Sequence, residues 1–205
     1  MSNLIELNFT IVLIGGKDVG KTQFLLKYTD NYFPETHVAS IGVEYKTKTL
    51  IKGKYKITLN IWDTAGQEHF KSITKSFFNN AAGIIFIYDI NKMSTFSGPT
   101  GIKNWIKDAE EYGNFECAIC GNLIGSEKYR QVPFSDLKEL AIKKNFGCFE
   151  TCPKTGKNIN EAFDYLVEKI IKNRTEDELV KEFGIKEGKK SKTLSKKNIN
   201  HKKNC

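Results

Sequence analysis

The chain has 205 residues and a mass of 23.3 kDa, which suits one domain of ordinary size with a tail. A hydrophobic content of 40%, with 12% aromatic residues, excludes an intrinsically disordered chain. The longest apolar runs fall far below the roughly 20 residues of a membrane-spanning helix. The first ten residues lack the basic start and apolar core of a signal peptide, so we expect a cytosolic protein.

The net charge of +8 is concentrated at the C-terminus. Residues 186–205 hold eight lysines and one glutamate, a net +7, which leaves about +1 for residues 1–185. A basic body would indicate a nucleic-acid ligand, whereas a basic tail on a near-neutral body indicates an acidic membrane surface or partner. We therefore predict no nucleic-acid partner.

The five cysteines argue against a disulfide framework, because their number is odd and the chain looks cytosolic. Cys117 and Cys120, together with Cys148 and Cys152, have a spacing that allows a zinc site. The alternative, which we prefer, is that Cys120 and Cys148 act as small hydrophobic residues, since both lie in strand-like apolar runs.

Strand-like and helix-like segments alternate along the chain. Apolar or alternating runs predict strands over residues 8–14, 44–51, 55–62, 83–89, 116–121 and 146–150. Helical periodicity begins near residue 20 and recurs over residues 68–79, 102–112, 135–144 and 158–172. This order predicts an α/β fold, with a six-stranded, mostly parallel sheet and helices on both faces. We place the domain at residues 1–175 and a flexible basic tail at residues 176–205.

A phosphate-binding loop follows the first strand, where ligands of such sheets bind. The segment G15-G-K-D-V-G-K-T22 is a complete G-x-x-x-x-G-K-[ST] match between a strand and a helix. We expect its backbone to surround phosphates through Gly15, Gly16, Lys17, Asp18, Val19 and Gly20. Lys21 is expected to reach the β- and γ-phosphates, and the Thr22 hydroxyl to bind Mg²⁺.

A second phosphate-side segment, W62-D-T-A-G-Q-E68, follows the third strand. Asp63 is placed to hold Mg²⁺ through water, and Gly66 to offer its N–H to a γ-phosphate. Gln67 is the candidate catalytic residue, because its amide can orient an attacking water.

With these motifs the chain resembles the Ras-superfamily small GTPases, and among them the Rab family. The resemblance covers about residues 7–173, and its Rab-like stretches are S40-I-G-V-E-Y45, I61-W-D-T-A-G-Q-E-H-F70, F77-F-N-N-A-A-G-I-I85 and I87-Y-D-I90. It implies the fold of a P-loop NTPase small G domain and a GTP/GDP switch in vesicle traffic. It also implies Mg²⁺ as cofactor, and exchange factors, GTPase-activating proteins and effectors as partners.

Several positions keep or change the family pattern on the phosphate side. Ser40 stands where the family has a threonine that closes on Mg²⁺ and the γ-phosphate, so its hydroxyl is a candidate metal ligand. His37 and His69 replace the usual tyrosine and arginine. Lys17 and Asp18 replace small residues: Lys17 either crowds an arginine finger or supplies charge itself, and Asp18 weakens nucleotide retention. We therefore predict slow hydrolysis and fast exchange.

On the base side the resemblance is weaker. The family reads guanine with the aspartate of N-K-x-D, but after Asn122 this chain has Leu123 at the lysine position and Gly125 at the aspartate position. We expect Asn122 to remain as a strut between loops. Glu127 is a less favoured surrogate for the missing acid.

Four further residues complete the predicted base side. Phe33 matches the aromatic residue that packs on guanine. The family's T-S-A-K loop reads T151-C-P-K154, which assigns Cys152, Pro153 and Lys154 to the base. Upstream, Gly98-Pro99 lies in a stretch about three residues longer than the usual Rab spacing, and should delay the next helix.

The lysine-rich tail ends in Cys205, which the resemblance makes a candidate for prenylation, although Rabs commonly carry two cysteines there. One lipid and a polybasic stretch together anchor a protein at a membrane. We therefore expect a cytoplasmic protein that binds the cytosolic face of endomembranes reversibly. Three functions stay open: a slow GTP-hydrolysing switch, which we favour, a Rab-shaped scaffold with weak nucleotide binding, and an NTPase with relaxed base preference.

Overall fold

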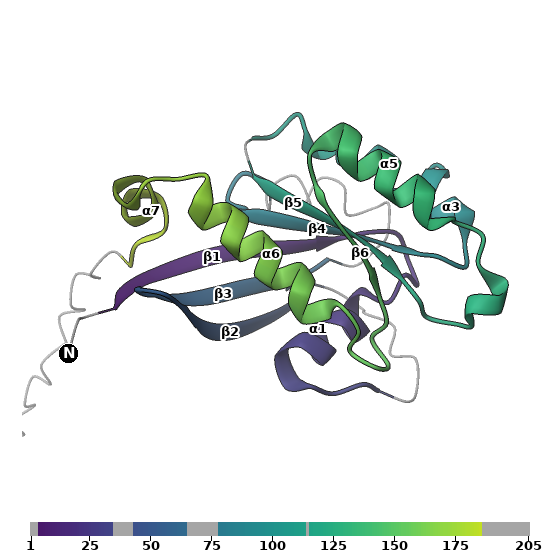
Figure 1. Cartoon of the computed structure of the whole chain (residues 1–205), viewed down its shortest axis with the longest axis horizontal. Helices are drawn as coiled ribbons and strands as arrows, with labels where there is room; N and C mark the ends of the chain where they lie inside the picture. The colour runs from purple at the N-terminus through teal and green to yellow at the C-terminus, as the bar shows by residue number, and fades with distance from the viewer. Residues whose placement is uncertain (1–3, 35–42, 65–77, 114, 186–205) are drawn as a thin grey trace, which may run out of the picture.

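The computed structural model describes residues 4–34, 43–64, 78–113 and 115–185, which form a six-stranded sheet in the order β2-β3-β1-β4-β5-β6 (Figure 1). The strands are β1 (Ile5–Ile14), β2 (Glu44–Lys52), β3 (Tyr55–Asp63), β4 (Gly83–Asp89), β5 (Glu116–Asn122) and β6 (Gly147–Thr151). Strands β2 and β3 form an antiparallel hairpin at one edge, and all other neighbours are parallel. This confirms the predicted mostly parallel sheet.

Helices cover both faces of the sheet and bury a separate apolar cluster on each (Figure 1). They are α1 (Lys21–Asp30), α3 (Met93–Ser97), α4 (Ile102–Ala109), α5 (Phe134–Lys144), α6 (Ile159–Lys172) and α7 (Glu176–Phe183), with a short 3₁₀ helix, η2 (Glu127–Tyr129). One face carries α1, α6 and α7, and the other carries α3, α4 and α5. The predicted α/β fold is confirmed.

The predicted strands match the observed ones closely. Strand β4 has the predicted bounds, because an unbroken buried run ends at the polar Asp89. Four other strands differ from the prediction by one to three residues at one end, and β6 is shifted by one residue at both ends. The helix predicted over residues 68–79 lies almost wholly outside the described residues.

Gly98-Pro99 delays the start of α4, as predicted, and the short helix α3, which was not predicted, precedes it. The N–H of Gly98 bonds to the Ser94 carbonyl at 3.0 Å, which closes α3, and the N–H of Gly101 bonds to the Gly98 carbonyl at 2.9 Å. A second helix then begins at Ile102. The extra residues therefore form a surface turn between α3 and α4.

Helix α7 corrects the predicted domain boundary at residue 175. Thr175 and Glu178 form a reciprocal capping box, which satisfies backbone groups at the start of α7. Phe183 packs edge-on against Phe9 of β1, with ring centroids 5.0 Å apart. Gly184 then pairs with Leu7 in an isolated β-bridge. Residues 176–185 thus belong to the folded domain rather than to a tail.

The cysteines of β5 behave as core residues. Cys117 and Cys120 are buried, and burial raises the pKa of both thiols. In the described part of the chain no three histidine, cysteine, aspartate or glutamate side chains gather as a metal site would require. No helix in that part is long and apolar enough to cross a membrane.

Candidate functional site

The parallel register brings the predicted site residues to one edge of the sheet. Leu13 of β1 lies opposite Asp63 of β3, while Asn122 of β5 lies between Asp89 of β4 and Thr151 of β6. The loops that follow these strands therefore share the carboxyl edge, where ligands of such sheets bind.

The loop from Gly15 to Gly20 connects β1 to α1, as the motif predicts. A Cβ at Gly15 would lie 2.1 Å from the carbonyl oxygen of Ile87, so only glycine fits there. Gly20 has a φ of +79° and Asp18 a φ of +59°, both in the left-handed region. Asp18 occupies a conformation that aspartate tolerates better than most residues do. The loop thus keeps a tight curve despite this acidic substitution.

Lys21 lies inside this loop. Its Nζ donates hydrogen bonds to the carbonyl oxygens of Gly15, at 3.1 Å, and Gly16, at 2.9 Å. The side chain is buried, and burial lowers the pKa of its ammonium group. The negative charges of Asp63 and Asp18 also act on this buried ammonium group. An ammonium group has three donors, so beside the two carbonyls it has capacity left for an anionic ligand such as a phosphate.

Thr22 and Asp63 form the candidate metal centre. The Thr22 hydroxyl donates to Oδ2 of Asp63 at 2.5 Å, and Asp63 is fully buried. Burial raises the pKa of the Asp63 carboxyl to about 6. Its other oxygen, Oδ1, has no hydrogen-bond partner among the described residues. A hydroxyl beside a buried carboxylate with a spare oxygen fits Mg²⁺, which prefers hard oxygen ligands.

Asn122 joins three loops of the site. Its Nδ2 donates to the carbonyl oxygen of Val19 at 3.0 Å, and its Oδ1 accepts from the Thr151 hydroxyl at 3.0 Å. All of these groups are buried. A Cβ at Gly20 would lie 2.7 Å from Nδ2, so the close approach of the loops depends on that glycine. The expected role of Asn122 as a strut is confirmed.

Replacing Asn122 with alanine is expected to lower the free energy of unfolding by about 2–6 kcal/mol, at about 1–3 kcal/mol for each buried partner left unbonded. Denaturant titration measures this change. The control is Asn104→Ala, because the Asn104 amide also donates two hydrogen bonds, to Gly98 and Pro99, but in an exposed position. Equal losses in the two variants would contradict the buried-strut interpretation.

The loop after Asn122 offers no carboxylate at the position that would meet a guanine. Gly125 stands there, and its N–H donates to Oδ1 of Asn91 at 3.3 Å. The Asn91 Nδ2 in turn donates to the carbonyl oxygen of Ser126 at 2.9 Å. Leu123 packs against an apolar cluster, and so does not replace the lysine of the family motif. Asn91 therefore shapes this loop.

Glu127 is already paired, which opposes the surrogate role considered for it. Its Oε1 accepts from Nε of Arg130 at 2.6 Å. Arg130 also holds both oxygens of Glu150, at 2.5 and 3.1 Å. Glu150 lies in β6, just before Thr151, so Arg130 ties the two base-side loops together.

Of the remaining predicted site residues, the structure describes four on the base side. Phe33 is half-buried, Cys152 is half-buried, Pro153 is buried and Lys154 is exposed. Cys152 forms an isolated bridge with Lys157, which gives the last loop its shape. Outside the described residues lie His37, Ser40, Gly66, Gln67, His69 and Cys205.

Sequence reasoning missed Asn91 and Arg130. The signal for Asn91 was present, because it follows the strand end at Asp89 by two residues. Nothing in the sequence pairs Arg130 with Glu150, since they lie 20 residues apart.

Known proteins of similar sequence belong to the Ras family, and among them are several Rab proteins. The model of the Ras family matches residues 10–172. Rab-15 of Homo sapiens is 35% identical over 173 residues, which cover 83% of this chain and 80% of that protein. Rab-8B of Homo sapiens is 36% identical over 173 residues, covering 83% and 82%. Rab-3D of Mus musculus is 35% identical over 170 residues, covering 82% and 76%.

Proposed function

The chain belongs to the Ras family, and from this membership and its site we propose that it is a GTP/GDP switch. In this proposal the phosphate-binding residues are retained and guanine selectivity is weakened. Its relatives make it a Rab-like small GTPase of membrane traffic. The observation that carries the finer proposal is the contrast between the assembled Lys21, Thr22 and Asp63 and the bare Gly125.

On the phosphate side, Lys21 binds the β- and γ-phosphates, and Thr22 and Asp63 hold Mg²⁺. Mg²⁺ held there would supply positive charge beside the phosphates. Ser40 and Gly66 close on the γ-phosphate, and Gln67 orients the attacking water; these three roles come from the family motif alone. Ordering of these segments by GTP would present the surface that effectors and GTPase-activating proteins recognise.

On the base side, guanine stacks against Phe33 and contacts the loop that holds Cys152, Pro153 and Lys154. Its N1–H and N2–H₂ donors find no carboxylate at Gly125. Two charge-assisted hydrogen bonds contribute roughly 1.5–3 kcal/mol each, so their loss weakens guanine binding by about two to four decades. Fast exchange follows from this loss and from the negative charge of Asp18.

Membrane attachment and the rate of GTP hydrolysis depend on the tail and on Lys17. A prenyl chain on Cys205 and the lysines of residues 186–205 attach the protein reversibly to the cytosolic face of endomembranes. Exchange factors load it there. Lys17 occupies the space of an arginine finger, and hydrolysis is therefore slow.

The test is titration of the purified protein with fluorescent GTP, GDP and ATP, with and without Mg²⁺. We expect Mg²⁺-dependent binding with a guanine preference of about tenfold or less. Strong guanine preference at micromolar or tighter affinity would refute weakened selectivity. Absence of binding would refute the switch and favour the scaffold alternative, and single-turnover cleavage at an ordinary Rab rate would refute slow hydrolysis.

A further inference from the structure

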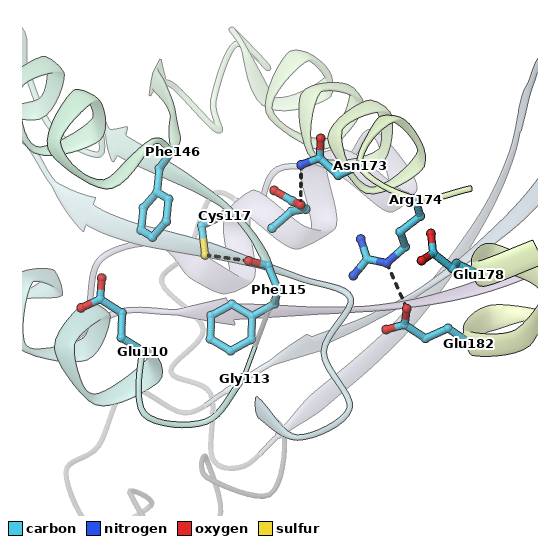
Figure 2. Close-up of a pocket in the computed structure, with 10 residues that line it drawn as sticks. Glu110, Gly113, Phe115, Cys117, Phe146, Asn173, Arg174, Glu178 and Glu182 are labelled. Carbon is cyan, nitrogen blue, oxygen red and sulfur yellow. Dashed lines mark hydrogen bonds and ion pairs between the residues drawn. The ribbon is translucent and has the colours of Figure 1, made fainter. Parts of the chain in front are cut away.

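A groove lies at the edge of the sheet opposite the nucleotide site (Figure 2). It has a volume of about 730 Å³ and lies beside Glu116, the first residue of β5, whereas Asn122 at the other end of β5 belongs to the nucleotide site. A smaller cavity of about 330 Å³ adjoins it and shares Gly113, Phe115 and Glu182. Helix α7 forms one wall of both, so the groove exists because α7 folds back onto the domain.

The groove combines apolar and acidic side chains. Figure 2 shows Phe115, Cys117 and Phe146 on one side, with Glu178 and Glu182 of α7 facing them across the space. Four carboxylates line the groove, from Glu110, Glu116, Glu178 and Glu182, while Arg174 is its one cationic lining residue among those described. This chemistry suits a basic segment that also carries an aliphatic side chain.

The carboxylates already have partners but keep room for more. Glu182 pairs with Arg174 at 3.0 Å and remains 51% exposed, and Glu110 pairs with Lys144 at 2.6 Å and remains 45% exposed. A carboxylate offers about four lone-pair sites, so each of these accepts a further ammonium group. Arg174 is itself a lining residue, so a docked ammonium group would share Glu182 with it.

The chain itself supplies a segment of matching chemistry. Residues 186–205 carry eight lysines against one glutamate, and Leu194 and Ile199 are their aliphatic residues. This segment begins immediately after Ile185, beside Phe183 and Glu182, which line the smaller cavity. At about 3.3–3.6 Å per residue, the nine residues from Ile185 to Leu194 reach about 30 Å, more than twice the roughly 12 Å length of α7.

We propose that residues 186–205 dock into this groove, with lysines against Glu110, Glu178 and Glu182 and Leu194 against Phe115 and Phe146. A covalent tether gives the tail an effective concentration in the millimolar range, an advantage that no separate partner has. Docked lysines are withdrawn from an anionic membrane, so the groove competes with the membrane for the tail. The docking stands without the proposed function, whereas its effect on membrane binding rests on it.

Carbodiimide cross-linking of the full-length, unlipidated protein tests the docking, with the linked peptides mapped by mass spectrometry. We expect tail lysines to link to Glu110 and Glu182, and these links to fade as ionic strength rises, because a Debye length shrinks from about 10 Å at 0.1 M to about 3 Å at 1 M. Links within one chain are expected in a mixture of ¹⁴N and ¹⁵N protein. Links spread evenly over exposed carboxylates such as Glu161, or links between isotopes, would overturn the proposal.

A matched pair of variants tests the competition. Glu110→Gln with Glu182→Gln removes two groove charges, and Glu139→Gln with Glu161→Gln removes two exposed charges on α5 and α6. We expect the groove variant to lose the cross-links from tail lysines to Glu178, a groove carboxylate that it keeps, and to bind phosphatidylserine vesicles about three- to tenfold more tightly than the control variant. Equal vesicle binding by the two variants would overturn the competition. Groove cross-links in the parent, with no vesicle binding by the parent or either variant, would support docking and refute the proposed membrane role.

Discussion

Replacing Gly125 with aspartate is expected to raise the affinity for GDP by about two to four decades. The new carboxylate would accept two hydrogen bonds from guanine, at roughly 1.5–3 kcal/mol each. The backbone allows it, because Gly125 does not have a left-handed φ. A Cβ there would lie 3.1 Å from Oδ1 of Asn91, the end of a side chain that can move by a few tenths of an ångström. Titration of the variant with fluorescent GDP measures the gain.

The control for this prediction is Gly125→Asn, which has the same shape but no carboxylate. Inosine diphosphate, which lacks the 2-amino group, provides a second control. The aspartate variant should prefer GDP over inosine diphosphate by about tenfold or more, since one charge-assisted hydrogen bond separates them, while the parent should distinguish them little. Equal GDP affinity in the aspartate and asparagine variants would show that Gly125 is not the position that faces the base.

The parts of the fold that sequence predicts well are those where burial decides the residue types. Strand β4 was predicted at both ends because it is buried on both faces and therefore apolar throughout. Helix α7 was missed because only Leu179 and Phe183 of its eight residues are buried, and its polar remainder looks like a tail. Its docking on Phe9 depends on a contact 174 positions away in the chain, which local patterns do not report.

The residues of the candidate site also divide into those that the sequence predicts and those that it does not. Lys21 and Thr22 are predictable because the backbone curve of a phosphate loop requires adjacent residues in a set order. The partners of Gly125 and Glu127 are not, because Asn91 and Arg130 reach them through the fold. The sequence thus identifies Gly125 as the position that lacks a carboxylate, and the structure shows which side chains bond to the loop around it.

Asp63→Asn is expected to stabilise the nucleotide-free protein at neutral pH. The pKa of the Asp63 carboxyl is raised from 3.8 to about 6 by burial, so the folded state holds its proton more tightly than the unfolded state. At pH 7 this corresponds to a penalty on the order of 2–3 kcal/mol, which the neutral amide removes. For a chain of this size the melting temperature should rise by roughly 4–12 °C.

The pH dependence follows from the direction of that shift. Below the unfolded pKa, Asp63 is protonated in both states and carries no penalty; as pH rises through about 6 the penalty becomes complete. The difference in melting temperature between Asp63→Asn and the parent should therefore shrink as the pH is lowered from 7 toward 4. A constant difference across this range would contradict the assignment to Asp63.

The same variant separates stability from metal binding. In the parent, Mg²⁺ with GDP should raise the melting temperature, because the ion offsets the buried charge of Asp63 and engages its spare oxygen. In Asp63→Asn this Mg²⁺-dependent rise should be largely lost, although the variant starts from a higher melting temperature. Glu139→Gln, at an exposed position of α5, is the control and should change neither quantity. A full Mg²⁺ response in Asp63→Asn would place the metal elsewhere.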